Sequence, residues 1–180
     1  LDLCAGTLDV GAAIAKARGF SGLVIGADFA EPMLRAGRGK GPAAVLAPVA
    51  ADALALPVGD ASCDGAIVAF GIRNVIDMPA AFREILRVLT PGARFVVLEF
   101  STPRSAIVRW TYELYSRRVL PLVGGLISGH PTAYQYLPDI VARFPSAEEL
   151  KVMMADAGFA NVSVTRLTFG VAALHVGEKR

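Results

Sequence analysis

The sequence predicts an α/β domain built on a mostly parallel sheet with helices on both faces. Short apolar segments alternate with helical patterns from the first residue to about Ser101, and this alternation is typical of βαβ units. Two further apolar segments, 161–168 and 171–176, flank a short turn at Phe169 and Gly170. This spacing predicts that the sheet ends in an antiparallel hairpin formed by the C-terminal part of the chain.

Residue patterns set the bounds of each expected element. Strands are expected at 1–4, 22–28, 45–50, 63–70, 94–100, 161–168 and 171–176. Helices are expected at 10–18, 31–38, 79–89, 106–119, 139–143 and 146–158. The helix at 79–89 is amphipathic, with Phe82 and Ile85 on one face, and Pro91 is expected to stop it before a strand that starts at 94. Ser146 with Glu149 three positions later is a capping-box pattern that marks the start of the last helix.

The 180 residues are enough for one domain with a sizeable core. We therefore expect a single domain over 1–180, with a substrate-side insertion at about 103–145, where the strand–helix alternation stops. The chain opens on what looks like the second half of a strand, so we expect an N-terminal piece to be missing.

Composition excludes several classes of protein. With 54% hydrophobic and 19% charged residues, the chain is not disordered. Its net charge of +2, with scattered Lys and Arg, argues against nucleic-acid binding. Cys4 and Cys63 lie in apolar segments without metal-ligand spacing, so we expect buried thiols and no metal site. The mean hydropathy of +0.50 is high, yet no apolar run reaches the ~20 residues of a spanning helix, and a cytoplasmic protein is expected.

Four segments follow predicted strands at the edge where parallel sheets bind ligands. In the first, Gly6 allows a ligand to approach the backbone. The dinucleotide pattern G-x-G-x-x-G is broken there, because Thr7 and Leu8 follow Gly6 and the next glycine is Gly11, so a ligand without phosphates is favoured. In the second, Asp28 lies about 20 residues further on, where an acid binds ribose hydroxyls. The alternative is that Asp28 caps the next helix.

The third and fourth segments follow the next two strands. Asp52 and Ala53 precede small and apolar residues, a composition that can bind an adenine amino group and enclose its ring, or can simply form a surface loop. Ala69 ends an apolar strand, and Arg73 and Asn74 come just after it. This pair lies on the side of the sheet expected for an active site, and the alternative is a solvated Arg beside a capping Asn.

Five segments together resemble the ubiquinone/menaquinone biosynthesis C-methyltransferase family: 1–9, 26–34, 51–57, 70–75 and 87–101. The last of these is similar to a family signature, with departures at Thr90 and Ala93. Further similar segments are 134–138, 141–145 and 169–175. The resemblance implies a Rossmann-like class I methyltransferase fold with S-adenosylmethionine as the cofactor. It also implies that the missing N-terminal piece is a helical segment.

By position, the resemblance places Thr7, Asp28, Asp52 and Ala53 at cofactor contacts, next to Gly6 and Ala69. Ala69 stands where many members have Ser. Leu8 replaces a usual glycine, and we expect it to crowd the methionine end of the cofactor. The implied reaction is C-methylation of a prenylated quinol, either demethylmenaquinol or the corresponding ubiquinone precursor.

For this reaction Arg73 is expected to favour the substrate phenolate, with Asn74 orienting it. His130 and His175 are alternative bases, although His175 fits a structural position in the last strand. The basic and apolar segment 117–127 is expected either to lie at a membrane interface, as a peripheral contact for the prenyl tail, or to form a buried helix or homodimer contact. Rival interpretations are a non-catalytic lipid-binding or assembly subunit and an NAD-dependent oxidoreductase.

Overall fold

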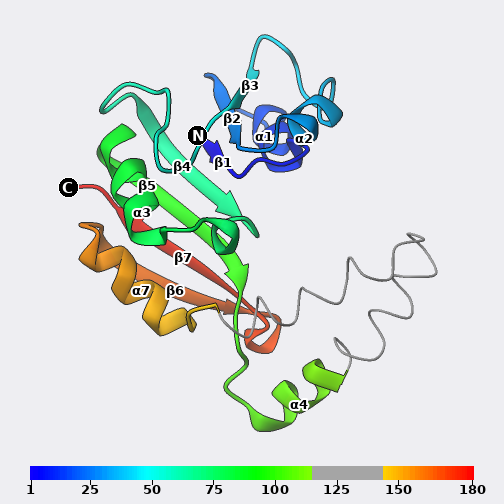
Figure 1. Cartoon of the computed structure of the whole chain (residues 1–180), viewed down its shortest axis with the longest axis vertical. Helices are drawn as coiled ribbons and strands as arrows, with labels where there is room; N and C mark the ends of the chain where they lie inside the picture. Colours follow the sequence, from blue (N-terminus) through cyan, green and yellow to red (C-terminus); the bar gives the residue numbers. More distant parts are fainter. Residues whose placement is uncertain (115–143) are drawn as a thin grey trace.

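The computed structural model describes residues 1–114 and 144–180, and these residues form a sheet with the strand order β3-β2-β1-β4-β5-β7-β6 (Figure 1). Neighbours from β3 to β5 are parallel. Strand β7 lies antiparallel between β5 and β6. The strands are β1 Asp2–Leu3, β2 Val24–Asp28, β3 Leu46–Ala50, β4 Cys63–Ala69, β5 Leu89–Phe100, β6 Ala160–Leu167 and β7 Ala172–Glu178. The predicted fold class, including the carboxyl-terminal hairpin, is confirmed.

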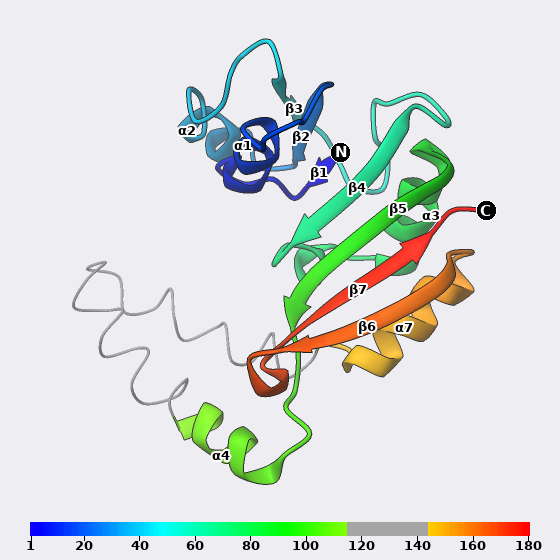
Figure 2. The same ribbon diagram turned by 180° about the vertical axis from the view of Figure 1, so that it is seen from behind.

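Helices cover both faces of this sheet (Figure 2). The α-helices are α1 Asp9–Ala15, α2 Glu31–Ala36, α3 Met78–Val88, α4 Ala106–Leu114 and α7 Ala147–Asp156. Helices α1 and α2 pack on β2 and β3 around Leu8, Ala12, Val24, Leu34 and Leu46. Helices α3 and α7 lie behind the sheet in Figure 2, and their apolar faces join the larger core cluster.

The larger core forms because alternate residues of the strands point to opposite faces. Phe95 of β5 packs edge-on against Phe82 of α3, with ring centroids 5.9 Å apart, and against Phe159 at 5.3 Å. Phe82 and Ile85 are fully buried, as the amphipathic pattern of this helix predicts. Burying side chains of this size stabilises the fold by roughly 1.5–3 kcal/mol each. The core therefore fixes α3 and the ends of β4 and β5 relative to one another.

Two sequence signals at helix ends are confirmed. Ser146 and Glu149 form the complete capping box of α7, in which each side chain accepts from the other residue's backbone N–H. Gly158 follows this helix at φ +113°, a left-handed conformation that glycine adopts without steric cost. Helix α7 therefore ends at Asp156, just before the predicted stop at Gly158.

Two predicted boundaries differ from the structure by three residues or more. Helix α1 ends at Ala15 rather than at 18, before the turn that contains Gly19. Strand β5 begins at Leu89 rather than at 94, because Leu89 pairs with Cys63 and the Gly92 N–H donates to the Lys179 carbonyl. Long-range pairing of this kind leaves no local sequence signal.

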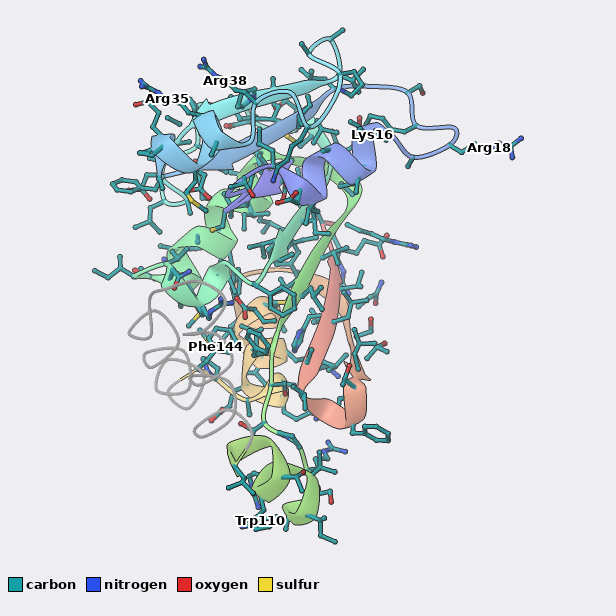
Figure 3. All side chains as sticks on the ribbon, turned by 90° about the vertical axis from the view of Figure 1, so that its right-hand side faces the viewer. Lys16, Arg18, Arg35, Arg38, Trp110 and Phe144 are labelled. Atoms are coloured by element: carbon teal, nitrogen blue, oxygen red, sulfur yellow. The ribbon has the colours of Figure 1, made fainter. Side chains whose placement is uncertain are left out.

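Several expected features lie outside the described residues. They are the end of the 106–119 helix, the 139–143 helix, the 117–127 segment, His130, most of the 103–145 insertion and the 134–138 and 141–143 segments. Before that gap, α4 carries an exposed Trp110 at the opposite end of the molecule from Arg35 of α2 and from Arg38, which follows this helix (Figure 3). In the described part of the chain, no helix is both long and apolar enough to cross a membrane.

His175 links the hairpin to α7. It is 1% exposed in β7, and its Nε2 lies 2.8 Å from the carbonyl oxygen of Ala147, so Nε2 carries the proton and donates. Burial lowers the pKa of the imidazole below its ordinary value, although the contact with Ala147 partly opposes this. These contacts agree with the structural interpretation of His175 and not with the alternative that it acts as a base on the substrate.

We therefore expect the free energy of unfolding to fall as the pH drops below ~6.5, the ordinary His pKa. There the unfolded chain takes up a proton that the folded chain does not, which destabilises the fold by up to about 1.4 kcal/mol per pH unit. Urea unfolding at pH 5 to 8 measures this slope. His175→Gln retains a donor for Ala147 and should reduce the slope, whereas an unchanged slope would assign it to other groups.

Candidate active site

A cleft of about 570 Å³ opens at the carboxyl ends of the parallel strands, within the usual size range of small-molecule sites. It is lined from four directions, by residues after β1, β2, β3 and β4. The lining residues are Leu3, Cys4, Ala27, Asp28, Phe29, Ala30, Ala51, Asp52, Ala53, Leu54, Gly71, Asn74, Val75 and Ile76. The topology thus brings the four segments singled out in the sequence to one edge, where open α/β sheets bind ligands.

A second hollow of about 660 Å³ lies at the opposite edge of the sheet. It is lined mainly by residues at the amino ends of β2, β4 and β5, including Val24, Cys63 and Arg94. Although it is the larger of the two, the described polar strand-tip residues Asp28, Asp52 and Asn74 line the other cleft. We therefore assign the chemistry to the smaller cleft.

Asp28 joins the first two turns of the cleft. Its Oδ2 accepts a hydrogen bond of 2.8 Å from the Gly6 N–H, and its Oδ1 accepts one of 2.7 Å from the Ala30 N–H. The N-cap residue of α2 is Ala30, which makes no side-chain cap, so Asp28 orders the turn before the helix rather than capping the helix itself. The carboxylate is half-buried and remains on the cleft wall.

Leu8 lies away from the cleft. Its side chain is 2% exposed and belongs to the cluster between α1, β2 and β3. A Cβ on Gly26 would lie 2.4 Å from Leu8 Cδ2, so the leucine occupies space that a larger residue at position 26 would fill. The expectation that Leu8 crowds the methionine end of a cofactor is therefore wrong, because its φ of 63° turns the side chain into the core.

The loop after β3 lines the cleft with Asp52, which is also exposed to the solvent, and with the less exposed Ala53 and Leu54. Asp52 Oδ1 accepts from the Leu54 N–H at 2.9 Å, which holds the loop in a tight turn. Within this turn the Ala55 N–H also donates to the Asp52 carbonyl. A carboxylate and two apolar side chains therefore face the same end of the cleft.

Helix α3 anchors the far side of this loop. Glu84 accepts from the Leu56 N–H at 2.7 Å. Arg87 donates to the carbonyls of Leu56 at 3.1 Å and Val58 at 2.9 Å, and it pairs with Asp60 and Glu84. The pairing with Arg87 lowers the pKa of the Glu84 carboxyl. The position of the Asp52 turn thus depends on side chains outside the cleft.

The segment after β4 carries a buried ion pair. Arg73 lies in the short helix η1, Ile72–Asn74, and its Nη1 is 3.0 and 2.9 Å from the two carboxylate oxygens of Glu99 in β5. The Arg73 side chain is 12% exposed and that of Glu99 only 1%. The guanidinium also lies 5.4 Å from the ring centroid of Phe100, a cation–π distance. Asn74, the next residue, lines the cleft.

Charges of one sign predominate around Cys4. Burial, followed by the nearby carboxylates of Asp28, Glu99 and Asp2, raises the pKa of its thiol to about 12, and Arg73 partly opposes this increase. Burial likewise raises the pKa of Asp2 to about 6, against the hydrogen bond from the Gly11 N–H. Three carboxylates against one guanidinium make this wall of the cleft suited to a cationic group and unsuited to a phosphate.

No cluster of three His, Cys, Asp or Glu side chains that could hold a metal ion occurs among residues 1–114 and 144–180. The cleft residues of the described chain therefore offer hydrogen bonds, apolar walls and negative charge to a ligand.

Comparison with known proteins identifies the family. The model of the ubiE/COQ5 methyltransferase family matches residues 1–179. The chain belongs to this family. It is 50% identical to the demethylmenaquinone methyltransferase of Thermus thermophilus, over 99% of this chain and 81% of that protein. It is 45% identical to the ubiquinone/menaquinone biosynthesis C-methyltransferase UbiE of Geobacter sulfurreducens, over 99% of this chain and 71% of that protein.

Solved structures share the fold at lower identity. One is a methyltransferase described as dependent on S-adenosylmethionine, from Thermotoga maritima, with a TM-score of 0.69 and 22% identity over 99% of this chain and 80% of that one. Another, from Aquifex aeolicus, has a TM-score of 0.69 and 16% identity with the same coverage. These matches show a Rossmann-like class I methyltransferase fold, consistent with membership of the ubiE/COQ5 family.

The predicted site residues of this ubiE/COQ5 member fall into two groups. Four of them line the cleft: Asp28, Asp52, Ala53 and Asn74. Gly6 adjoins it through the Asp28 carboxylate. The others lie beside it without lining it, namely Thr7, whose hydroxyl donates to Asp9, and Ala69 and Arg73. Three of the four cofactor contacts that the resemblance assigns by position, Asp28, Asp52 and Ala53, thus line one cleft, whereas Thr7 does not line it.

Sequence reasoning missed Asp2, Cys4 and Glu99. Asp2 and Glu99 are each 1% exposed, and each is a single acid between apolar residues of a strand. That pattern was the available signal, because a carboxylate is rarely fully buried unless it is paired or functional. Cys4 carried no such signal, since a buried thiol behaves as a small apolar group.

Arg87→Ala tests whether the α3 anchor positions the Asp52 turn. Losing two carbonyl contacts and two carboxylate contacts should lower the free energy of unfolding by roughly 1–2 kcal/mol. It should also weaken S-adenosylmethionine binding by about threefold to tenfold, which calorimetry measures. Arg83→Ala, on the exposed side of the same helix, is the matched control and should change neither quantity. Unchanged binding in Arg87→Ala would show that the loop holds its shape without α3.

Proposed function

We propose that this chain transfers a methyl group from S-adenosylmethionine to a ring carbon of a prenylated quinol in quinone biosynthesis. The substrate is demethylmenaquinol or the corresponding ubiquinone precursor. The observation that carries the proposal is the 43–50% identity to C-methyltransferases of this pathway along 99% of the chain, in a protein whose described residues form the cleft above.

The cleft fits the cofactor of the family. S-adenosylmethionine carries two positive charges, no phosphate, and an adenosine group. The acids around Cys4 suit the positive charges. The Gly6 N–H, which a phosphate would need, already donates to Asp28. Asp28, Asp52 and Ala53 line this cleft; we expect Asp28 to bind the ribose hydroxyls, and Asp52 and Ala53 to bind and enclose the adenine.

When bound, the cofactor supplies an electrophilic methyl group, so the protein has to position a nucleophilic carbon next to it. A quinol carbon becomes nucleophilic when its neighbouring hydroxyl ionises, and a free phenol does so only near pH ~10. Arg73 can favour the phenolate electrostatically. Phe100 places an aromatic surface next to this guanidinium, and its ring centroid lies 4.8 Å from that of Phe70. Asn74 offers an amide at the cleft wall.

The proposal includes a peripheral membrane contact, through which a prenylated substrate would enter. Three large apolar side chains near the hairpin and α4 are exposed, namely Ile107 at 76%, Trp110 at 64% and Phe169 at 87%. Helix α4 carries Ile107 and Trp110, and the hairpin turn 168–170 carries Phe169. Both elements lie near the carboxyl ends of β5 and β6, at the edge of the sheet that holds the cleft (Figure 1). The 117–127 segment, which the sequence suggests for the same role or for a homodimer contact, lies outside the described residues.

The rival interpretations differ in ligand chemistry. An NAD-dependent oxidoreductase needs backbone donors and a tolerant charge environment for a pyrophosphate, whereas Asp28 uses the Gly6 N–H and acids surround Cys4. A non-catalytic lipid-binding or assembly subunit would retain the cleft and lack turnover. Competition of NAD with S-adenosylmethionine in a binding titration separates the first rival, and an assay with quinol separates the second.

Deleting the gene tests the proposed function in the cell. The quinone pool should accumulate demethylmenaquinone or a demethylated ubiquinone precursor, as measured by mass spectrometry, and plasmid-borne wild type should restore the methylated quinone. A pool that stays fully methylated in a strain with no second gene of this family would contradict the proposal.

Arg73→Ala tests the predicted role of the guanidinium. Because the phenolate loses its stabilising charge, kcat for the quinol should fall by about 10²–10⁴-fold, with S-adenosylmethionine affinity retained. Arg73→Lys, which keeps the charge without the planar group, should give intermediate turnover. Full turnover in Arg73→Ala would remove the residue from the mechanism.

A further inference from the structure

Glu99 is a carboxylate in an apolar part of β5 that is almost entirely removed from water. Both of its oxygens contact one nitrogen of Arg73, at 3.0 and 2.9 Å. Oε2 also accepts from the Phe100 N–H at 3.1 Å. Burial without such partners would be costly, so the position of Glu99 depends on Arg73, and Arg73 is held by Glu99.

The ion pair lies directly beside the cleft. Gly71 packs so closely on the first turn that a Cβ at this position would lie 2.3 Å from Cys4 Cβ. Cys4 and Gly71 both line the cleft, and Arg73 is two residues further along. Both charges of the pair act on the thiol of Cys4, since Glu99 raises its pKa and Arg73 lowers it.

This placement creates a conflict of charge. An arginine stays protonated in proteins, and an uncompensated guanidinium beside the cleft would repel a cofactor that is itself cationic. A phenolate-forming substrate nevertheless requires a donor such as Arg73 at the same place. Both requirements can be met when a carboxylate on the protein side of the guanidinium cancels its charge and fixes the orientation of the Arg73 side chain.

We propose that Glu99 is a positioning residue that holds Arg73 beside the cofactor cleft and compensates its charge there. This inference rests on the proposed function for the role of Arg73 in turnover. The compensation of charge does not, because it concerns binding of the cofactor alone. Among residues 1–114 and 144–180, the side chain of Arg73 makes its hydrogen bonds through Nη1 alone, which leaves Nε and Nη2 as donors for a substrate oxygen.

The test compares two ligands that differ by one charge. S-adenosylhomocysteine has the shape of the cofactor without the methyl group or the positive charge on sulfur. In Glu99→Gln, the uncompensated Arg73 should lower the preference for S-adenosylmethionine over S-adenosylhomocysteine by about tenfold. The two dissociation constants, measured by calorimetry on the purified protein, give this ratio. In the double variant Arg73→Gln with Glu99→Gln, the ratio should return to within about twofold of wild type.

A purely structural role predicts a different result, since a disturbed site would weaken both ligands equally and leave the ratio unchanged. That outcome would overturn the proposal. An unchanged ratio together with quinol methylation would overturn this inference and leave the proposed function standing, whereas a changed ratio without any quinol methylation would overturn only the proposed substrate.

Glu99→Asp covers the case in which Glu99→Gln does not fold. The aspartate keeps the charge and shortens the side chain by one methylene, so the ligand ratio should stay within about twofold of wild type. Because Arg73 is then displaced, kcat should fall by about tenfold or more while KM for S-adenosylmethionine changes little. A lowered ligand ratio or wild-type kcat in this variant would contradict the proposal.

Discussion

The two hydrogen bonds accepted by Asp28 are the interaction on which the cleft depends. Parallel strands bring their carboxyl ends to one edge, but the turns that follow them are not held there by the sheet ladder. Asp28 connects the turn after β1 to the turn after β2 through the N–H groups of Gly6 and Ala30. Hydrogen bonds to a carboxylate are among the stronger ones in proteins, so this residue sets the shape of the site before any ligand binds.

The remaining turns are fixed from behind. Arg87 and Glu84 of α3 hold the loop that carries Asp52, and Glu99 of β5 holds Arg73. Asp52, which lines the cleft, is exposed, and Arg73, which lies beside it, is half-buried. The side chains that hold them come from a packed helix and from the sheet. The site is therefore built on rigid elements, which is the arrangement that gives precise positioning.

Negative charge is the second property of the site. Asp2, Asp28 and Glu99 all act on Cys4 in the first turn, and the opposing charge is that of Arg73, which pairs with Glu99. A dinucleotide site on the same fold class would place backbone N–H donors toward a pyrophosphate. Here the first turn has lost that pattern and a carboxylate uses its glycine N–H, so the electrostatics select a cationic cofactor over an anionic one.

The sequence by itself determined the fold class, the order of the elements, the capping box at Ser146 and the acids at the strand tips. These follow from local periodicity and from residues next in the chain, as with Asp28 at the end of β2. Only the tertiary structure decided the start of β5, the inward direction of Leu8 and the pairing of Arg73 with Glu99. Each of these depends on a partner far along the chain, such as Lys179 for Gly92, or on a backbone angle that no neighbouring residue dictates.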